Sequence, residues 1–347
     1  MGCHDVEGMA GEPESLRARV GRRDRPVHRM TTAWMKRWAT PDGLARQAAA
    51  TAWLLGDDVP RPEGFGDVDG RVDLRGLSLA PPQVLARYGF RGVSTSVLSG
   101  VIELRSNSWS AIDLSGSTLP NLRFFDFTFE NCAFVRSRCI DWRLWGSTVR
   151  ACDFERADLR DALLTSWHEG QTNTWTDVSF RRTNLRGSTT SGGTFDGCAF
   201  DDASLRGQEF RQTSFRDCTF AGTLQDVRFD ARVVPDMPVA DTMRRVDFSR
   251  ATFQEVYLSG CRFEDVRWPT VQGIRVYPRQ YEIMRAALAR LEGDERHEAQ
   301  QMRWIIEPEL KFRGAEDSAG VFVREDYVKW GGEPLATLAE TLYFPTA

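Results

Sequence analysis

The sequence predicts an all-β solenoid, a four-sided coil of short strands with helical caps at its two ends. Three observations lead to this fold class. A large apolar residue recurs every five positions through the middle of the chain, a small or β-branched residue precedes each one by two positions, and identical residues recur at intervals of twenty. Repeats of this kind are typical of proteins whose structural units stack along one axis.

The large apolar residues mark a period of five. They include Leu104, Trp109, Leu114, Leu119, Phe124, Phe129, Phe134, Leu144, Phe154, Leu159, Phe180, Leu185, Phe200, Leu205, Phe220, Phe248, Phe253, Leu258, Phe263 and Trp268. The phase slips by one near Trp175 and again near Leu224. Five matches neither the helical period of 3.6 nor the strand period of 2. The pattern therefore indicates a chain that turns one corner in every repeat and points one large and one small side chain inward.

Spacings of twenty residues favour four corners in each coil. Cys132 and Cys152 lie twenty positions apart, as do Cys198 and Cys218. The same interval separates Phe180, Phe200 and Phe220. A four-sided coil of about twenty residues would place each of these sets in a ladder along the rod, with coils about 4.8 Å apart.

These residues resemble the pentapeptide repeat family, whose loose motif is Ala-Asp/Asn-Leu-X-X with Leu or Phe at its centre. The segments "ADLRD" from Ala157, "TNLRG" from Thr183, "CDFER" from Cys152 and "VDFSR" from Val246 fit this motif closely. The resemblance covers about residues 102–268, with an earlier fragment, "VDLRG", from Val72. It implies a right-handed quadrilateral β-helix, in which Cys139, Glu169 and Thr190 mark departures from the motif.

The part of the chain before the repeats divides into three segments. Residues 1–29 are rich in Arg, Gly and Glu without periodicity and are expected to be disordered, and Met30 is an alternative start of the protein. Residues 30–71 are predicted to form a helical N-terminal cap, with Thr40 as N-cap, Pro41 at the first helical position and Gly56 as the stop. Residues 72–101 should hold the first repeats and an irregular connection, a short helix or loop.

Residues 102–268 should form the β-helix, with an excursion at about 230–243, where two prolines interrupt the period. After Pro269 the spacing becomes helical, and residues 269–347 are predicted to form a helical C-terminal cap. The apolar positions of its three expected helices are Tyr281, Met284, Leu288 and Leu291, then Met302, Ile305 and Ile306, then Leu335, Leu338 and Leu342. A solenoid needs such caps because its last coils would otherwise expose apolar surface and unpaired strand edges.

Composition excludes several classes of protein. No apolar run approaches the length of about 18 residues that a membrane-spanning helix requires. The start of the chain lacks the apolar core of a secretory signal, which predicts a cytoplasmic protein without a membrane partner. Net charge is only −4, so direct binding of nucleic acid is not expected.

Candidate chemistry is sparse, and no cofactor is implied. The cysteines show neither a C-x-x-C motif nor metal-ligand spacing, so we expect no metal site and interpret them as small buried apolar groups. His168 and Glu169 lie at the first phase slip and form a candidate acid–base pair, against the alternative of a solvated loop. Trp167 and Trp175 flank this loop and are candidate partner-binding residues.

Three functions remain open. The first is a non-catalytic solenoid that binds a protein partner, for which the family resemblance suggests a type II topoisomerase, because its members include bacterial proteins that protect DNA gyrase from quinolones. It predicts an acidic face that mimics DNA and a homodimer through a terminal cap. The second is a scaffold or accessory factor for a biosynthetic enzyme assembly, acting through Trp34, Trp38 and Trp53 or through the C-terminal cap. The third is an enzyme that uses His168 and Glu169.

The charge of the repeats weakens the hypothesis that the partner is DNA gyrase. DNA's field arises from its phosphates, so a mimic needs a strongly acidic stripe. Residues 104–268 contain 23 acidic and 21 basic residues and are nearly neutral. An acidic stripe would have to arise from segregation of Asp and Arg onto different faces of the rod.

Overall fold

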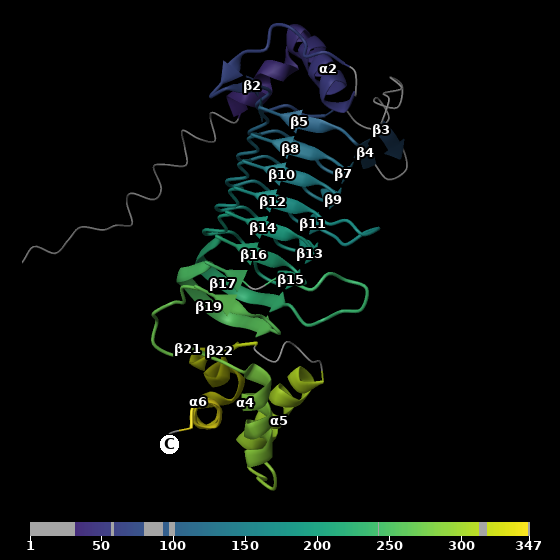
Figure 1. Ribbon diagram of the computed structural model, residues 1–347. Helices are drawn as coiled ribbons and strands as arrows, with labels where there is room; N and C mark the ends of the chain where they lie inside the picture. The colour runs from purple at the N-terminus through teal and green to yellow at the C-terminus, as the bar shows by residue number, and fades with distance from the viewer. Residues whose placement is uncertain are drawn as a thin grey trace, which may run out of the picture.

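The computed structural model describes residues 32–56, 59–79, 93–96, 101–241, 243–311 and 318–345. Three predictions fall on residues outside these ranges: disorder in residues 1–29, an alternative start at Met30, and a connection at Pro81-Pro82. The predicted fold class is confirmed, because the middle of the chain is a right-handed four-sided β-helix with helices at both ends (Figure 1).

Two sides of the coil are parallel sheets of short strands. The first sheet face contains β4 (Val101–Arg105), β7 (Leu122–Phe125), β9 (Arg143–Trp145), β11 (Leu163–Thr165), β13 (Thr189–Ser191), β15 (Glu209–Arg211), β17 (Thr219–Asp230) and β19 (Asp247–Ser259). The second sheet face contains β5 (Ser108–Ser110), β8 (Thr128–Glu130), β10 (Thr148–Arg150), β12 (Thr174–Thr176), β14 (Thr194–Asp196), β16 (Ser214–Arg216), β18 (Met243–Arg244) and β20 (Phe263–Glu264). Most neighbours pair twenty residues apart, as Phe195 does with Phe215.

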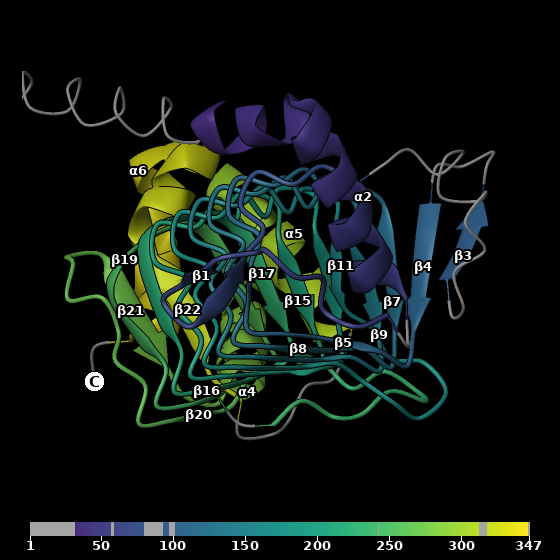
Figure 2. The same ribbon diagram turned by 90° about the horizontal axis from the view of Figure 1, so that it is seen from above.

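The other two sides of the coil are narrower and pair mainly through single parallel bridges. On the third face the bridges run Asp113, Ala133, Asp153, Ser179, Ala199 and Thr219, and on the fourth they run Ser78, Thr118, Arg138, Asp158, Asn184 and Ser204. In the last two coils β17 and β19 pair along most of their length, from Ala221↔Arg250 to Asp230↔Ser259, with a gap at Glu255. Figure 2 shows the coils stacked along a common axis.

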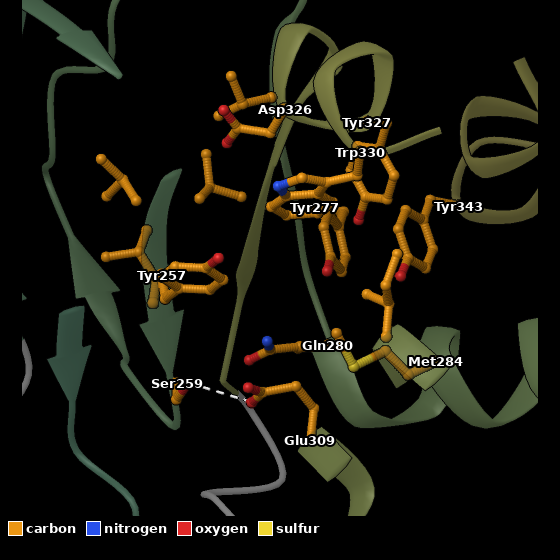
Figure 3. Close-up of a pocket in the computed structure, with 15 residues that line it drawn as sticks. Tyr257, Ser259, Tyr277, Gln280, Met284, Glu309, Asp326, Tyr327, Trp330 and Tyr343 are labelled. Atoms are coloured by element: carbon orange, nitrogen blue, oxygen red, sulfur yellow. Dashed lines mark hydrogen bonds between the residues drawn. The ribbon is translucent and has the colours of Figure 1, made fainter. Parts of the chain in front are cut away.

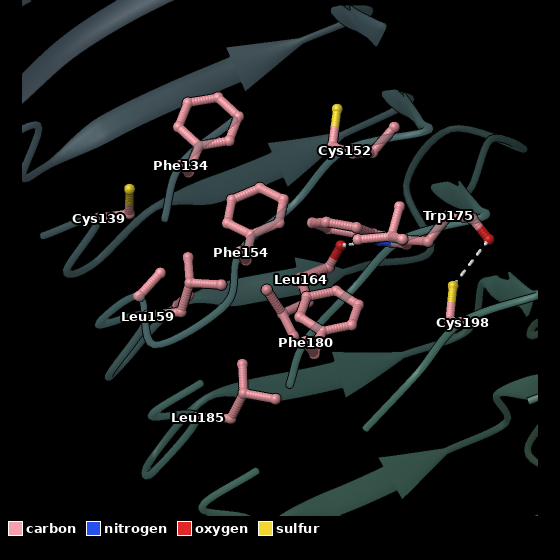
Figure 4. Close-up of a cluster of buried hydrophobic side chains, with 14 of the residues drawn as sticks. Phe134, Cys139, Cys152, Phe154, Leu159, Leu164, Trp175, Phe180, Leu185 and Cys198 are labelled. Atoms are coloured by element: carbon pink, nitrogen blue, oxygen red, sulfur yellow. Dashed lines mark hydrogen bonds between the residues drawn. The ribbon is translucent and has the colours of Figure 1, made fainter. Parts of the chain in front are cut away.

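Aromatic rings fill the interior as the five-residue period predicts. A ladder of stacked rings runs Phe134, Phe154, Phe180, Phe200, Phe220, Phe248 and Trp268, with centroids 4.7–5.7 Å apart. Figure 4 shows three of its phenylalanines beside Leu159 and Leu185. The six described cysteines are buried and free, and burial raises the pKa of the Cys261 thiol to about 12. They pack as small apolar groups, as predicted.

The corners explain the polar residues of the repeat. The last residue of each five takes a left-handed conformation, for example φ 51° at Asp126, 51° at Asn131 and 56° at Asp141. Asp, Asn and Gly adopt this conformation at the lowest cost. On the narrow faces, an Asp between the two inward residues accepts a hydrogen bond from the backbone two positions on, as Asp153 does from the Glu155 N–H at 2.8 Å.

The N-terminal cap begins as the sequence predicts. Residues 32–36 are helical, followed by η2 (Arg37–Ala39) and α2 (Pro41–Leu55). The Thr40 hydroxyl accepts from the Gly43 N–H, Pro41 opens α2, and Gly56 ends it. Helix α2 covers the first coil, where the Trp109 indole donates to the Leu54 carbonyl at 2.8 Å.

The first coil is longer than the sequence predicts. Strand β1 (Asp67–Val68) pairs antiparallel with β2 (Arg71–Asp73), which pairs in parallel with β6 (Ile112–Asp113). Val72 is thus opposite Ile112, forty residues away rather than twenty. The described part of the insertion, β3 (Val93–Ser96), pairs antiparallel with β4 and is therefore a strand, not the expected helix or loop. Local spacing could not predict a pairing made across the insertion.

The C-terminal cap contains the three predicted helices and a hairpin that the sequence did not predict. The helices are α4 (Gln280–Arg290), α5 (His297–Leu310) and α6 (Arg324–Tyr343), the last kinked at Gly331-Gly332. Strands β21 (Ile274–Tyr277) and β22 (Gly320–Val323) pair antiparallel. The cap has its own core, which includes Met284, Met302, Phe322, Tyr327 and Leu335.

Polar contacts fix the C-terminal cap to the last strand of the rod. Both carboxylate oxygens of Asp326 accept from the Glu255 backbone N–H of β19, at 2.9 and 3.0 Å. Lys329 forms an ion pair with the Glu255 side chain at 2.9 Å. Burial raises the pKa of Asp326 to about 6, and the negative charges of Glu255 and Glu325 contribute to this rise. The hydrogen bond from the Glu255 N–H and the positive charge of Lys329 act in the opposite direction.

Truncation of an inward ring should unfold the rod far more readily than truncation of an outward side chain. We expect Phe200→Ala to lower the free energy of unfolding by about 3–5 kcal/mol, because Phe200 is fully buried between Phe180 and Phe220. Arg206→Ala, at an exposed position, should cost less than about 0.5 kcal/mol. Urea titrations measure both, and equal losses would contradict the inward register.

The raised pKa of Asp326 predicts a stability difference that depends on pH. The folded protein retains this proton between about pH 4 and 6, whereas the unfolded chain has lost it, so the contribution of Asp326 to stability falls as the pH rises through this window and stays at its low value above about pH 6. Asp326→Asn stays neutral and should be more stable than the wild type by about 1–3 kcal/mol at pH 7.5. This advantage should disappear below about pH 4 in unfolding titrations, and a difference independent of pH would argue against a buried carboxylate.

Candidate partner-binding surface

Two excursions leave the solenoid at the same corner, between the first and second sheet faces. Residues 166–173 connect β11 to β12, and residues 231–242 connect β17 to β18. Figure 1 shows both excursions projecting on the side of the rod that carries β3 and β4. The first phase slip and the proline-rich segment of the sequence therefore belong to one region of the surface.

The first excursion is a tight hairpin on a buried anchor. His168 and Gln171 exchange two backbone hydrogen bonds, and Glu169 and Gly170 between them take positive φ angles of 50° and 80°. Asn173 at its base is fully buried, and its amide donates to the Leu144 and Leu164 carbonyls at 2.8 and 2.9 Å. The sequence analysis did not identify Asn173, because an Asn in a loop is ordinarily solvated.

The second excursion is held to the corner by two side chains, Gln212 and Ser214. The buried Gln212 amide donates to the Arg232 carbonyl and accepts from the Ala240 N–H at 3.0 Å. The Ser214 hydroxyl accepts from the Asp241 N–H at 3.0 Å. Both ends of the loop are therefore fastened to the coils beneath.

The two excursions meet over Gly192, which has a φ of 72°. A side-chain carbon placed on Gly192 would lie 3.6 Å from the Trp167 Cβ and 3.8 Å from the Pro238 Cγ. The Ser191 hydroxyl is 3.9 Å from the Met237 sulfur. We call the surface formed by residues 166–173 and 231–241 the two-loop corner.

Apolar side chains are exposed at the two-loop corner. Among the described residues of 102–268, the large apolar side chains counted as exposed are Trp167, Val233 and Val239, at 36%, 62% and 57%. All three lie on the excursions rather than on the flat faces of the rod. Trp167 is thus accessible on the surface, and its role in partner binding stays a prediction.

The prediction that Trp175 binds a partner is wrong, because this residue is buried. Its side chain is 1% exposed, and its indole donates to the Leu164 carbonyl at 3.0 Å inside the coil (Figure 4). It cannot contact a partner. The five-residue period in fact places Trp175 on an inward position, so its burial follows from the repeat.

His168 and Glu169 do not form a confined acid–base site. The His168 Nε2 and Glu169 Oε1 atoms lie 3.7 Å apart, and the side chains are 56% and 83% exposed. Neither residue lines the cavities described in this structure. Without desolvation or a substrate pocket, this pair has the environment of a solvated loop.

The tryptophans of the N-terminal cap are used in packing. Trp38 is buried and donates to the Arg75 carbonyl, Trp53 packs against the core, and the Arg75 guanidinium lies 5.0 Å from the Trp34 ring centroid. In the C-terminal cap, Trp304 on α5 is instead 70% exposed. Of the two regions considered for scaffold contacts, the C-terminal cap presents the more accessible tryptophan.

An outward aromatic stack on the first sheet face was missed by the sequence analysis. The Phe125 and Trp145 rings stack at 4.5 Å with an interplanar angle of 8°, and the Arg105 guanidinium lies 3.8 Å from the Phe125 centroid. The available signal was their spacing of twenty at the position after the inward residue. The period of inward residues does not reveal this stack, because both rings lie on outward positions.

Charges are mixed on every face of the rod. The charged residues of the first sheet face are Glu103, Arg105, Arg123, Asp126, Arg143, Glu209, Arg211, Arg228 and Asp230. Those of the second sheet face are Glu130, Arg150, Asp177, Asp196, Arg216, Asp217, Arg244, Arg245, Arg262, Glu264 and Asp265. The charged residues of the third face are Asp113, Arg136, Asp153, Glu155, Arg156, Arg181, Arg182, Asp201, Asp202, Asp247, Arg250 and Arg267. Those of the fourth face are Arg138, Asp141, Asp158, Arg160, Asp161, Arg186, Arg206, Asp226 and Glu255. Acidic and basic residues are nearly equal in number on each, and many pair directly, such as Arg245 with Asp217 at 2.6 Å. The described faces therefore hold no acidic stripe of the kind that DNA mimicry requires.

The described part of the chain offers neither a metal site nor a membrane-spanning helix. There, no three or more His, Cys, Asp or Glu side chains converge to hold a metal ion. Also within these residues, every helix is too short or too polar to span a bilayer.

Comparison with known protein families finds a match for part of the chain. Residues 179–217 match the model of pentapeptide repeats, in eight copies. No curated protein matches the chain significantly. Similar solved structures include the pentapeptide repeat protein Rfr23 from the cyanobacterium Cyanothece 51142, with 10% identity, a TM-score of 0.26 and coverage of 37% of this chain and 91% of that one.

Two further structures have comparable similarity. HetL, a pentapeptide repeat protein involved in heterocyst differentiation regulation in Nostoc sp. strain PCC 7120, has 16% identity and a TM-score of 0.19, with 48% and 83% of the chains covered. QnrB1, a plasmid-mediated fluoroquinolone resistance protein, has 17% identity and a TM-score of 0.19, with 45% and 82% covered.

Loss of the Gln212 amide should release the second excursion without unfolding the rod. Gln212→Ala removes the contacts to both ends of residues 231–241, so we expect faster amide hydrogen exchange and proteolysis there. Exchange in β14 and β16 should stay slow. Gln254→Ala, at an exposed position on β19, is the matched control, and equal exchange in both variants would contradict the role assigned to Gln212.

Proposed function

We propose that this chain, whose residues 179–217 match the model of pentapeptide repeats, is a non-catalytic solenoid that binds a protein partner at the two-loop corner. The observation that carries the proposal is the location of Trp167, Val233 and Val239. These exposed apolar side chains lie on the two excursions, whereas the faces of the rod carry mixed charges, and their outward aromatic stack, Phe125 and Trp145, is only partly exposed.

The composition of the corner suits a protein partner. Protein interfaces bury aromatic and aliphatic side chains at their centre and surround them with polar groups. Trp167 offers a large apolar surface next to Pro238, and the exposed His168 and Glu169 supply polar groups beside it. The anchors Asn173 and Gln212 hold both loops in place before a partner arrives, which reduces the entropy lost on binding.

A type II topoisomerase such as DNA gyrase is the first specific partner to test. The support for it is the resemblance to a family with gyrase-binding members. The mixed charge of the faces argues against binding in place of DNA, so a topoisomerase would have to be recognised through the two-loop corner. A gyrase supercoiling assay decides this point, and no change at micromolar protein would remove the topoisomerase from consideration.

Substitution of the corner should abolish partner binding while the rod stays folded. We expect the double variant Trp167→Ser, Val239→Ser to weaken binding by about tenfold or more, since an interface tryptophan commonly contributes 2 kcal/mol or more. Arg206→Ala on the fourth face is the matched control. Affinity capture from an extract of the source cells, with mass spectrometry, compares the three proteins.

The expected result is a partner that wild type and Arg206→Ala retain and that the double variant loses. The same set of captured proteins for all three would contradict binding at the corner. Loss with Arg206→Ala alone would move the interface to the fourth face.

Two other functions have less support. A homodimer through a cap would involve the exposed Trp304, and sedimentation of Trp304→Ser beside wild type would show whether self-association depends on it. For an enzyme at His168, the described cavities offer no support, because His168 lines none of them. Loss of cellular function in His168→Ala with the partner still bound would favour that alternative.

A further inference from the structure

A cavity lies in the seam between the rod and the C-terminal cap. Its volume is about 90 Å³. Strand β19 forms one wall through residues 256–259, and the cap forms the others through β21, β22 and its three helices (Figure 3). None of the residues that line the cavity belongs to the two-loop corner, so a proposal about its occupant does not depend on the partner proposed above.

The cavity contains a buried acceptor with no partner. Gln280, at the start of α4, is 5% exposed, and its Oε1 atom makes no hydrogen bond. Figure 3 shows the Gln280 amide pointing into the space between Tyr257 and Glu309. A buried amide oxygen without a donor is costly, and this indicates that a group carrying N–H or O–H belongs there.

Two carboxylates add to the acceptor character of the cavity. Glu309 on α5 accepts from the Ser259 hydroxyl at 3.1 Å, and Asp326 on α6 accepts from the Glu255 N–H. No Lys, Arg or His is among the residues that line the cavity. Arg228 and Arg232 come within 3.9 Å of the Glu309 oxygens from outside this lining and offset part of its charge.

Aromatic rings complete the lining. Tyr257 comes from the rod, and Tyr277, Tyr327, Trp330 and Tyr343 come from the cap. The faces of such rings attract cations, and rings combined with carboxylates are the usual environment of bound ammonium groups. The lining therefore favours a positively charged donor over an anion or an apolar molecule.

We propose that this seam cavity binds a small organic cation, a primary ammonium on a short aliphatic chain. The ammonium would donate to Gln280 Oε1 and to the Glu309 carboxylate, and the chain would pack against Met284 and Ile305. An apolar cavity of about 150 Å³ accommodates the six carbons of benzene, so about 90 Å³ limits the ligand to fewer heavy atoms than that.

Binding at this position joins the two parts of the protein. Because the walls come from both β19 and the cap, a ligand in contact with both stabilises the docked arrangement relative to the separated one. The ligand should therefore raise the temperature at which the cap unfolds from the rod.

The test uses the full chain and n-butylammonium chloride as the probe. Isothermal calorimetry and thermal unfolding should show binding with a dissociation constant on the order of a millimolar and a higher Tm. n-Butanol, sodium butyrate and sodium chloride at equal concentration control for the apolar chain, for the sign of the charge and for ionic strength. Binding of butanol as tight as that of butylammonium, or no binding of the amine, would overturn the proposal.

Variants assign the effect to the cavity. Glu309→Gln removes the charge, and Gln280→Met replaces the unpaired amide with an apolar chain of similar size; each should weaken binding by about tenfold or more. Glu307→Gln, at an exposed position on the same helix, should bind like the wild type. Gln280→Met keeps the test valid if Glu309→Gln fails to fold, and wild-type affinity in Gln280→Met would refute the site.

Discussion

Burial of one large side chain in every five residues is the constraint on which the rest of the structure depends. Because the backbone must return an inward residue after each corner, the corner residues adopt left-handed conformations at regular intervals, as at Asp126, Asn131 and Asp141. The stacked rings from Phe134 to Trp268 then align without further specification. The polar residues between inward positions satisfy the backbone of the turns. The five-residue period, the left-handed corners and the stacked core therefore all follow from the burial of one large side chain in every repeat.

The same constraint determines where variation is tolerated. A residue inserted within a side of the coil would shift every later side chain from inside to outside. A residue inserted at a corner extends a loop and leaves the next side in register. Residues 166–173 and 231–242 are insertions of this second kind, and both lie at the same corner. The solenoid provides a rigid support, and the insertions at this corner provide the surface that differs from one coil to the next.

Local and periodic features could be predicted from the sequence, and contacts between distant insertions could not. Thr40, Pro41 and Gly56 bound α2 because capping depends on neighbouring residues, and the ring ladder follows from spacing alone. The approach of Trp167 and Pro238 to Gly192 depends on how the two loops fold, and the five-residue period carries no information about that. Trp175 was assigned to the surface because of its proximity to a loop, although its place in the period required burial. The seam cavity combines residues of β19 with three helices and has no sequence signature.

Amide NOEs between neighbouring coils, measured on deuterated protein, test the four-sided coil most directly. Cross-strand contacts should link Thr194 with Ser214, Phe195 with Phe215 and Phe210 with Phe229, at separations of about twenty residues. The amides of residues 102–230 should lack the sequential i to i+3 contacts of a helix. Helical contacts through this region, or antiparallel pairing of adjacent segments, would contradict the coil and the surfaces built on it.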